Sequence, residues 1–141
     1  MNIDEEQRRL LPRPGWSDAT EPYWKAAGKG ELVVQVCDNC GYHRWPLNPG
    51  CFNCLSTEWS WAPVEGTGKV FSFTWADYPI PTDGERNIAV VELDGTNGPP
   101  VRVMSWVVDV AREALVCDLP VEVTFLPVDD EVSVPVWRPR S

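Results

Sequence analysis

Two pairs of cysteines constrain the fold of this chain more than any other feature of its sequence. Cys37 and Cys40 form one Cys-x-x-Cys pair, and Cys51 and Cys54 form a second pair after ten intervening residues. Each pair turns the chain tightly enough for two thiolates to reach one ion. Gly41 follows the first pair, where a glycine permits the positive φ that points backbone amides at sulfur. The spacing therefore predicts one tetrahedral zinc site with these four cysteines as its ligands.

Four thiolates would leave no open position on the metal for water or substrate, so we expect a structural zinc ion and no catalysis at this site. Iron would accept the same ligands and give an electron carrier, but a ribbon of this spacing beside a β-barrel usually holds zinc. Four unmetallated thiols are the remaining alternative. His43, the single histidine, is interpreted as a surface residue or a residue behind the ligands, because the site needs no fifth ligand.

The cysteine count also bears on the compartment. Five cysteines, four of them in close pairs, fit a metal site in a reducing compartment better than a disulfide framework. No apolar run approaches the roughly 18 to 20 residues of a membrane helix, and residues 1–10 are too charged for a secretion signal. We expect a soluble cytoplasmic protein. The fifth cysteine, Cys117, has no histidine or lysine near it in the sequence, and we expect a buried, inert thiol.

Charge argues against nucleic acid as the partner. The chain has 12 lysines and arginines against 21 aspartates and glutamates, a net charge of −9, and its basic residues form no stripe. A protein that binds single-stranded nucleic acid is nevertheless an alternative, because Phe71, Phe73 and Trp75 alternate along one predicted strand and could stack on bases. Alternate residues of one strand are also ordinary core.

Residues 1–30 are predicted to form an N-terminal helical segment. Thr20 can cap a helix whose first turn holds Pro22, where the backbone amide has no partner in any case. Tyr23 and Trp24 begin an apolar stripe at helical spacing, and glycines then end the helix. We interpret Tyr23 and Trp24 as docked on the protein's own core, and they are also our candidates for partner-binding residues.

From residue 31 onward the pattern indicates β-strands. A strand leads into the first cysteine pair and another, with Trp59 and Trp61 on one side, follows the second pair, which predicts a zinc ribbon over residues 31–62. Residues 63–141 hold five predicted strands with a short helix or turn after the third, the arrangement of an OB-fold barrel. The predicted fold class is mainly β, with an N-terminal helix, a zinc ribbon and a five-stranded OB-fold domain. The predicted barrel elements are strands at 68–78, 88–93, 101–108, 119–125 and 132–137, a loop at 79–86 and a helix or turn at 109–115.

The order of these parts resembles a known family. It is similar to the acyl-CoA-associated family, long described only as a domain of unknown function, in which a rubredoxin-like zinc ribbon is fused to an OB-fold. The resemblance covers about residues 20–140, and only the cysteine spacing is specific by itself. Besides the cysteines, the motifs that carry it are Gly66-x-Gly68-x-Val70-x-Ser72-Phe73-Thr74, Ile88-Ala89-Val90-Val91-Glu92-Leu93-Asp94-Gly95, Leu119-Pro120-Val121-Glu122-Val123 and Trp137-Arg138-Pro139.

The resemblance implies an accessory subunit whose catalysis belongs to a partner. Members of the family resemble partners of thiolase-like enzymes, including lipid-transfer-type thiolases, acyltransferases and the retro-aldolases of steroid side-chain degradation. The expected partner is a thiolase-fold subunit in a hetero-oligomer that processes acyl-CoA in lipid or steroid metabolism, with no nucleic acid and no membrane involved. In such assemblies the ribbon and the OB-fold domain pack on the thiolase-fold subunit and help shape the acyl-CoA channel. The resemblance assigns no residue of this chain to coenzyme A.

Two positions depart from the family pattern. Phe52 stands where the second cysteine pair commonly has proline, which leaves the thiolates in place. Cys117 and Asp118 stand where a glycine usually precedes the fourth barrel strand, so the family pattern does not predict the geometry of this turn. A stand-alone acyl-CoA hydrolase or transferase that uses Cys117 or carboxylate groups is a third hypothesis. It ranks last, because no Ser-His-Asp set, glycine-rich phosphate loop or paired carboxylate motif can be assembled.

Overall fold

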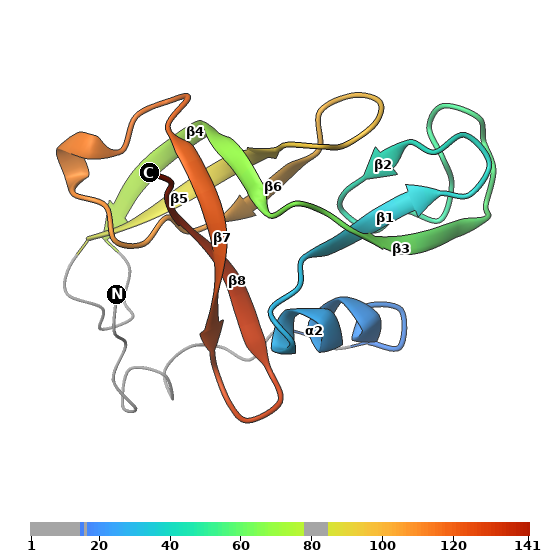
Figure 1. The fold of residues 1–141 in the computed structure, drawn as a ribbon, viewed down its shortest axis with the longest axis horizontal. Helices are drawn as coiled ribbons and strands as arrows, with labels where there is room; N and C mark the ends of the chain where they lie inside the picture. Colours follow the sequence, from blue (N-terminus) through green and yellow to red (C-terminus); the bar gives the residue numbers. More distant parts are fainter. Residues whose placement is uncertain (1–14, 16, 78–84) are drawn as a thin grey trace.

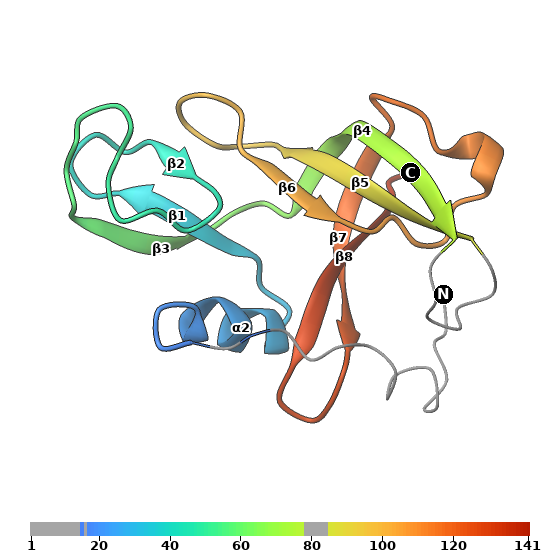
Figure 2. The same ribbon diagram turned by 180° about the vertical axis from the view of Figure 1, so that it is seen from behind.

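The structure is a computed structural model that describes residues 15, 17–77 and 85–141. The described residues form one α-helix, a three-stranded sheet and a five-stranded sheet. The helix and the small sheet lie at one end of the molecule and the large sheet at the other (Figure 1). The loop after β5 reaches from the large sheet toward β2 in both views (Figures 1 and 2). The predicted mainly β architecture is therefore confirmed.

Helix α2 spans Glu21–Gly28, with Pro22 in its first turn as predicted. The predicted cap by Thr20 is wrong, because its side chain makes no capping hydrogen bond. Thr20 has helical backbone angles (φ −99°, ψ −6°), whereas a capping residue is extended. Its hydroxyl instead accepts a hydrogen bond from the backbone N–H of Ser17 at 3.1 Å. The predictions for residues 1–14 lie outside the described residues.

The zinc ribbon is an antiparallel sheet with the strand order β2-β1-β3. In the central strand, Gln35 lies opposite Arg44 of one neighbour and Trp61 of the other. Cys37 is the last residue of this strand, so the first cysteine pair begins where the sheet ends. The strands are β1 (Val33–Cys37), β2 (His43–Arg44) and β3 (Trp59–Pro63).

The five-stranded antiparallel sheet has the order β6-β5-β4-β7-β8 and curls into the partly closed barrel of an OB-fold. Its edges meet where a parallel bridge joins Val107, just after β6, to Trp137 in β8. The backbone N–H of Val108 donates to the carbonyl of Trp137 at 2.7 Å and completes this closure. The short helix η1 follows and lies between the third and fourth barrel strands, as predicted. The elements are β4 (Thr67–Asp77), β5 (Glu85–Leu93), β6 (Arg102–Ser105), η1 (Arg112–Ala114), β7 (Pro120–Pro127) and β8 (Ser133–Pro139).

The third barrel strand is shorter than predicted. The sequence pattern predicted a strand over residues 101–108, but β6 ends at Ser105 because the following residues turn away to pair with β8. Asn87 of β5 holds this turn in place. Its side-chain amide donates to the carbonyl of Val107 at 2.8 Å, and its Oδ1 accepts from the N–H of Val107 at 2.9 Å. Asn87 is buried, so these two hydrogen bonds satisfy polar groups that would otherwise be unpaired. Of the predicted loop at 79–86, residues 79–84 lie outside the described residues, and the prediction is wrong for residues 85 and 86, which already belong to β5.

A β-bulge in β4 changes which residues face the core. The register against β5 shifts between Val70 and Ser72, which leaves Phe71 as the extra residue. Val70 is fully buried, and Phe73 and Trp75 pack against the same core. Phe71 alone is turned outward, with 46% of its surface exposed. The three aromatic side chains therefore do not form the single exposed stacking surface that nucleic-acid binding would use.

One apolar core joins the ribbon to the barrel. Leu32 and Val34, at the start of the ribbon, pack among the barrel residues rather than beside the cysteines. The first strand of the ribbon is therefore anchored by the barrel. No helix within the described ranges has the length and apolar character needed to cross a membrane. The buried members of this core are Leu32, Val34, Val70, Ala89, Val91, Leu93, Val101, Val103, Val107, Leu115, Val121 and Trp137.

The loop after β5 makes a second contact between the barrel and the ribbon. The backbone N–H of His43 donates to the carbonyl of Asn97 at 3.0 Å, and the N–H of Asn97 donates to Nδ1 of His43 at 2.9 Å. Gly98 has φ +89°, and a Cβ atom there would lie 2.8 Å from the ring of Tyr42. Only glycine fits this close approach, because both the space and the positive φ exclude a larger residue.

Candidate metal centre and adjoining cavity

The four sulfur atoms of the predicted site converge. The Sγ atoms of Cys37, Cys40, Cys51 and Cys54 all lie within 4.8 Å of one another. The Cys37 and Cys54 sulfurs are 3.6 Å apart, and the Cys40 and Cys51 sulfurs are 3.5 Å apart. A disulfide would bring two sulfurs to about 2.05 Å. A tetrahedral zinc ion with bonds of about 2.3 Å separates its sulfurs by about 3.8 Å, so the cluster fits zinc.

The two cysteine pairs fold into matching turns. The N–H of Gly41 donates to the carbonyl of Cys37 at 2.9 Å, and the N–H of Leu55 donates to the carbonyl of Cys51 at 2.9 Å. Gly41 has φ 77° and Leu55 has φ 64°. Leu55 therefore adopts the left-handed conformation that favours glycine, while 82% of its surface is exposed. The second pair keeps the turn geometry despite its less suitable residue.

Backbone amides within these turns stabilise negative charge on sulfur. The backbone N–H of Cys40 is the main cause that lowers the pKa of the Cys37 thiol to about 6. The backbone N–H of Cys54 likewise lowers the pKa of Cys51. At Cys40 the N–H of Tyr42 favours the thiolate, but the pKa is raised overall, because burial and the two neighbouring thiols oppose another negative charge. Four thiolates in one cluster therefore require a cation, which a zinc ion supplies when bound.

A buried polar network, not evident from the sequence, positions the second cysteine pair. The Gln35 side chain donates to the carbonyl of Asn48 at 2.7 Å and accepts from the N–H of Asn48 at 3.0 Å. Arg44 donates to the same carbonyl through Nη2 at 3.0 Å. Asn48 in turn accepts the N–H of Gly50, the residue before Cys51, at 3.1 Å. The available sequence signal was Gln35, a polar residue inside an otherwise apolar strand.

His43 lies outside the group of converging sulfur ligands. Burial lowers its pKa, which favours the neutral imidazole. A neutral ring can accept the N–H of Asn97 through Nδ1, and the structure shows that hydrogen bond. In the structure, His43 therefore links the ribbon to the barrel.

The fifth cysteine lies apart from the cluster, and the expectation that it is buried is wrong. Cys117 is exposed in the turn between η1 and β7. The next residue, Asp118, has φ 67°, and its N–H donates to the carbonyl of Val70 at 2.7 Å. Asp118 thus adopts the left-handed conformation that a glycine would favour at this position. The turn places Cys117 on the surface. This turn and strand β2, which holds His43, lie at opposite ends of the molecule (Figure 1).

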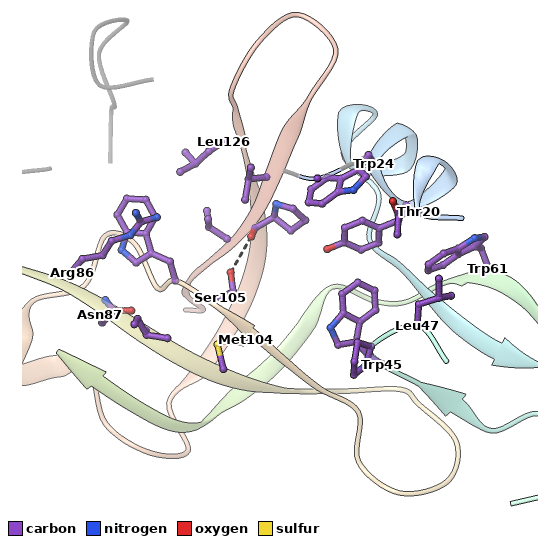
Figure 3. A pocket seen from close by; sticks show the side chains of 18 residues that line it. Thr20, Trp24, Trp45, Leu47, Trp61, Arg86, Asn87, Met104, Ser105 and Leu126 are labelled. Carbon is purple, nitrogen blue, oxygen red and sulfur yellow. Dashed lines mark hydrogen bonds between the residues drawn. The ribbon is translucent and has the colours of Figure 1, made fainter. Parts of the chain in front are cut away.

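An apolar cavity of about 660 Å³ lies between α2, the ribbon and the barrel (Figure 3). Aromatic side chains from α2 and the ribbon, including Trp24 and Trp45, form one end. At the other end the guanidinium of Arg86 lies 3.8 Å from the ring centroid of Trp106. Between them the hydroxyl of Ser105 donates to a backbone carbonyl of β8 at 3.0 Å. Walls of this kind suit an apolar ligand or an apolar segment of a protein.

Tyr23 and Trp24 both line this cavity. The Tyr23 ring centroid lies 4.9 Å from that of Trp45, 6.1 Å from that of Trp61 and 4.8 Å from that of Trp24. Burial raises the pKa of Tyr23 to about 12. Tyr23 therefore belongs to an aromatic cluster of the protein itself, and Trp24 packs edge-on against it at the cavity wall.

Two family models match the chain. The ChsH2 rubredoxin-like zinc ribbon domain matches residues 24–60, and the ChsH2 C-terminal OB-fold domain matches residues 61–126. Together they cover well over half of the chain. It belongs to the ChsH2 family. The match to the ChsH2 zinc ribbon and the convergence of four sulfurs identify structural zinc as the cofactor of this chain.

Similar proteins extend the ChsH2 assignment. A solved Ltp2-ChsH2(DUF35) aldolase is 31% identical with a TM-score of 0.79, over 90% of this chain and 98% of that chain. A DUF35-family protein of unknown function from Sulfolobus solfataricus shares the fold at 12% identity and a TM-score of 0.58, over 88% of this chain and 87% of that chain. A probable enoyl-CoA hydratase alpha subunit from Thermomonospora curvata is 30% identical over 136 residues, 96% of this chain and 42% of the relative. The chain thus spans about two fifths of that relative's length.

Proposed function

We propose that this chain is a noncatalytic accessory subunit of an acyl-CoA-processing enzyme, in a hetero-oligomer with a thiolase-fold partner. The observation that carries the proposal is the similarity to the Ltp2-ChsH2(DUF35) aldolase over 90% of the chain. The similarity to a probable enoyl-CoA hydratase alpha subunit supports the acyl-CoA part of it. The partner class is a lipid-transfer-type thiolase, an aldolase or an acyltransferase of lipid or steroid side-chain degradation. The complex is expected to act in the cytoplasm.

In this proposal the metal takes no part in the reaction. We assign Cys37, Cys40, Cys51 and Cys54 as zinc ligands, and four thiolates leave no position for a substrate. Cys117 has no base in His43, because the segments that carry them lie at opposite ends of the molecule (Figure 1). The chemical step therefore belongs to the partner subunit.

We place the contact with the partner, or with its acyl group, at the cavity face that holds Tyr23 and Trp24. This face also includes Met104, 74% of whose surface is exposed. Large apolar side chains gathered beside an apolar cavity are typical of interaction sites. Burial of Trp24 and Met104 against a partner would remove their apolar surface from water. Tyr23 would support Trp24 from behind through their ring contact.

Co-expression with a thiolase-fold protein encoded nearby in the genome tests this function. We expect a stable complex that processes acyl-CoA only when both chains are present. The substitutions Trp24→Ala and Met104→Glu should weaken the complex by at least about 10-fold. Val116→Glu is the control, because Val116 is likewise an exposed apolar residue but lies in the turn before β7, away from the cavity.

Two outcomes would contradict the proposal. In the first, the chain neither binds the thiolase-fold protein nor changes its solubility or activity. In the second, the isolated chain turns over short acyl-CoA substrates and Cys117→Ser abolishes that turnover. The second outcome would establish the stand-alone hydrolase or transferase instead.

A further inference from the structure

Arg44 is a buried cation without an anionic partner among the described residues. Only 4% of its surface is exposed. Its Nε donates to Oε1 of Gln35 at 3.0 Å and to the carbonyl of Asn48 at 3.2 Å, and its Nη2 donates to that carbonyl at 3.0 Å. Both acceptors are neutral. Within the described ranges its Nη1 has no hydrogen-bond partner, and no ion pair includes this guanidinium.

An uncompensated buried charge is unfavourable, so its retention calls for a physical reason. Arginine stays protonated at any pH at which proteins fold, and it cannot escape the cost by losing its proton. Lysine and arginine are almost never fully buried without a partner. Hydrogen bonds to Gln35 and Asn48 orient the guanidinium, but they do not neutralise it.

The fold places this charge beside the metal site. Arg44 lies opposite Gln35, which lies two residues before Cys37 in β1. Facing residues of neighbouring strands share one side of a sheet, and so do alternate residues of one strand. Arg44 and Cys37 are therefore on the same side of the ribbon. Arg44 also binds Asn48, three residues before Cys51, so the guanidinium lies on the order of 10 Å from the sulfur cluster.

We propose that Arg44 balances the negative charge of the zinc-loaded site. One zinc ion with four thiolates has a net charge of −2, which is more negative than an empty site in which most of the thiols keep their protons. A fixed positive charge at this distance in the protein interior favours the loaded site over the empty one. Arg44 is thus a positioning and charge-balancing residue for the metal. The inference rests on the proposed zinc ligands and is independent of any partner subunit.

Two simpler roles for Arg44 give different expectations. If it served only to hold Asn48, then Gln35 would matter as much, because Gln35 makes two hydrogen bonds to the same residue without carrying charge. If it were merely an unpaired charge, replacing it by an apolar residue of similar length would leave metal binding unchanged or improve it. Charge balance predicts that loss of the positive charge weakens zinc binding even when the length of the side chain is kept.

The test measures the zinc affinity of the full chain by competition with a chromophoric chelator at neutral pH, under reducing conditions. The variants are Arg44→Met, Arg44→Lys and Gln35→Met. We expect Arg44→Met to bind zinc about 10- to 100-fold more weakly than Arg44→Lys. Gln35→Met should lose less affinity than Arg44→Met. Failure of Arg44→Met to bind zinc, with binding retained in the other two variants, would support the proposal equally.

Three results would overturn the proposal. These are equal affinities for Arg44→Met and Arg44→Lys, tighter binding by Arg44→Met, and loss of zinc from all three variants. Because the isolated chain is used, failure to find a partner enzyme would leave this test unaffected. A second readout is the reduction potential of the iron-substituted site, in which the reduced form is more negative than the oxidised form. Arg44→Met should lower that potential relative to Arg44→Lys, and an unchanged potential would contradict charge balance.

Discussion

The ribbon and the barrel of this chain are stabilised by different chemistry. In the barrel, aliphatic side chains such as Val70, Val91 and Val121 are completely buried. In the ribbon, the buried residues near the cysteines are polar, namely Gln35 and Arg44, while Phe52 and Leu55 of the second cysteine turn are exposed. Apolar burial stabilises a barrel without any ligand. The cysteine turns bury little apolar surface of their own, so we expect their order to depend on a zinc ion bound by the four sulfurs.

The part of the molecule stabilised by apolar burial extends beyond the five-stranded sheet into the ribbon. Leu32, just before β1, and Val34, within β1, pack in the barrel core. The barrel loop that holds Asn97 is hydrogen-bonded to His43 of β2. We therefore expect the metal-dependent part of the ribbon to be the two cysteine turns, residues 37–41 and 51–56, which lie on either side of β2 in the sequence. The comparison shows that the ribbon shares its first strand with the larger core, and we expect its cysteine turns still to require the metal.

The largest effect is expected from removing one zinc ligand. Cys51→Ser should abolish zinc binding and disorder the two cysteine turns, because structural zinc sites contribute about 10–16 kcal/mol of apparent binding free energy to folding. Zinc content by elemental analysis and amide hydrogen exchange of the full chain measure both effects. Cys117→Ser, at the exposed cysteine, is the control and should retain zinc. If the metal-free Cys51→Ser protein kept its cysteine turns fully protected from amide exchange, the difference drawn between ribbon and barrel would be wrong.

Shortening a large side chain in the apolar core should destabilise the barrel and leave the zinc site intact. Trp137 is 1% exposed in the shared core, and Trp137→Ala should lower the free energy of unfolding by about 3–5 kcal/mol. Chemical denaturation followed by far-ultraviolet circular dichroism measures this change. Met104→Ala, at an exposed side chain, should change it by less than about 0.5 kcal/mol. The account predicts that folded Trp137→Ala protein still binds one zinc ion, and a loss of zinc from folded protein would contradict it.

The contact between the two regions should have an intermediate effect. Gly98→Ala forces a Cβ atom toward the Tyr42 ring at a positive φ, and it should cost about 1–3 kcal/mol of stability. Gly50→Ala is the matched control, since a Cβ atom there meets no atom within 4 Å and the residue has no positive φ. Hydrogen exchange should show faster opening of β2 in Gly98→Ala alone. Equal exchange in both variants would show that the loop does not fasten the ribbon.

The smallest effect concerns the two cysteine turns themselves. Leu55→Gly removes a left-handed leucine and should strengthen zinc binding by about 2-fold, because relief of the strained φ slightly exceeds the entropic cost of glycine. The reciprocal change, Gly41→Ala, should weaken zinc binding by about 5- to 10-fold, since φ there is 77° and alanine disfavours it. Competition titration measures both. Weaker binding by Leu55→Gly would show that the exposed leucine stabilises the turn.

The sequence predicted the parts of this molecule that depend on local pattern. The cysteine spacing predicted the convergence of four sulfurs, and runs of apolar and aromatic residues separated by turn signals predicted the barrel strands. The bulge at Phe71 was missed, because it appears only when the register against a second strand is known. The early end of β6 at Ser105 was missed for a similar reason, since Asn87 acts on Val107 across 20 residues of sequence.

The roles of the polar residues beside the cysteine cluster could not be predicted from the sequence, where the single signal was Gln35 in an otherwise apolar strand. Gln35 and Arg44 position the second cysteine pair through hydrogen bonds to Asn48, and the spacing of these residues in the sequence does not predict that contact. The wrong expectation for Cys117 came from treating a cysteine with no histidine or lysine near it in the sequence as buried. The φ of Asp118 shows instead that the residue pair occupies a tight surface turn.

The most direct test of the account is an amide NMR spectrum of the full chain before and after zinc is removed by a chelator under reducing conditions. The account predicts that amide signals of the two cysteine turns, residues 37–41 and 51–56, lose their dispersion, while signals from β4, β5 and β7 keep their positions. Retained dispersion in the cysteine turns after complete metal removal would contradict it.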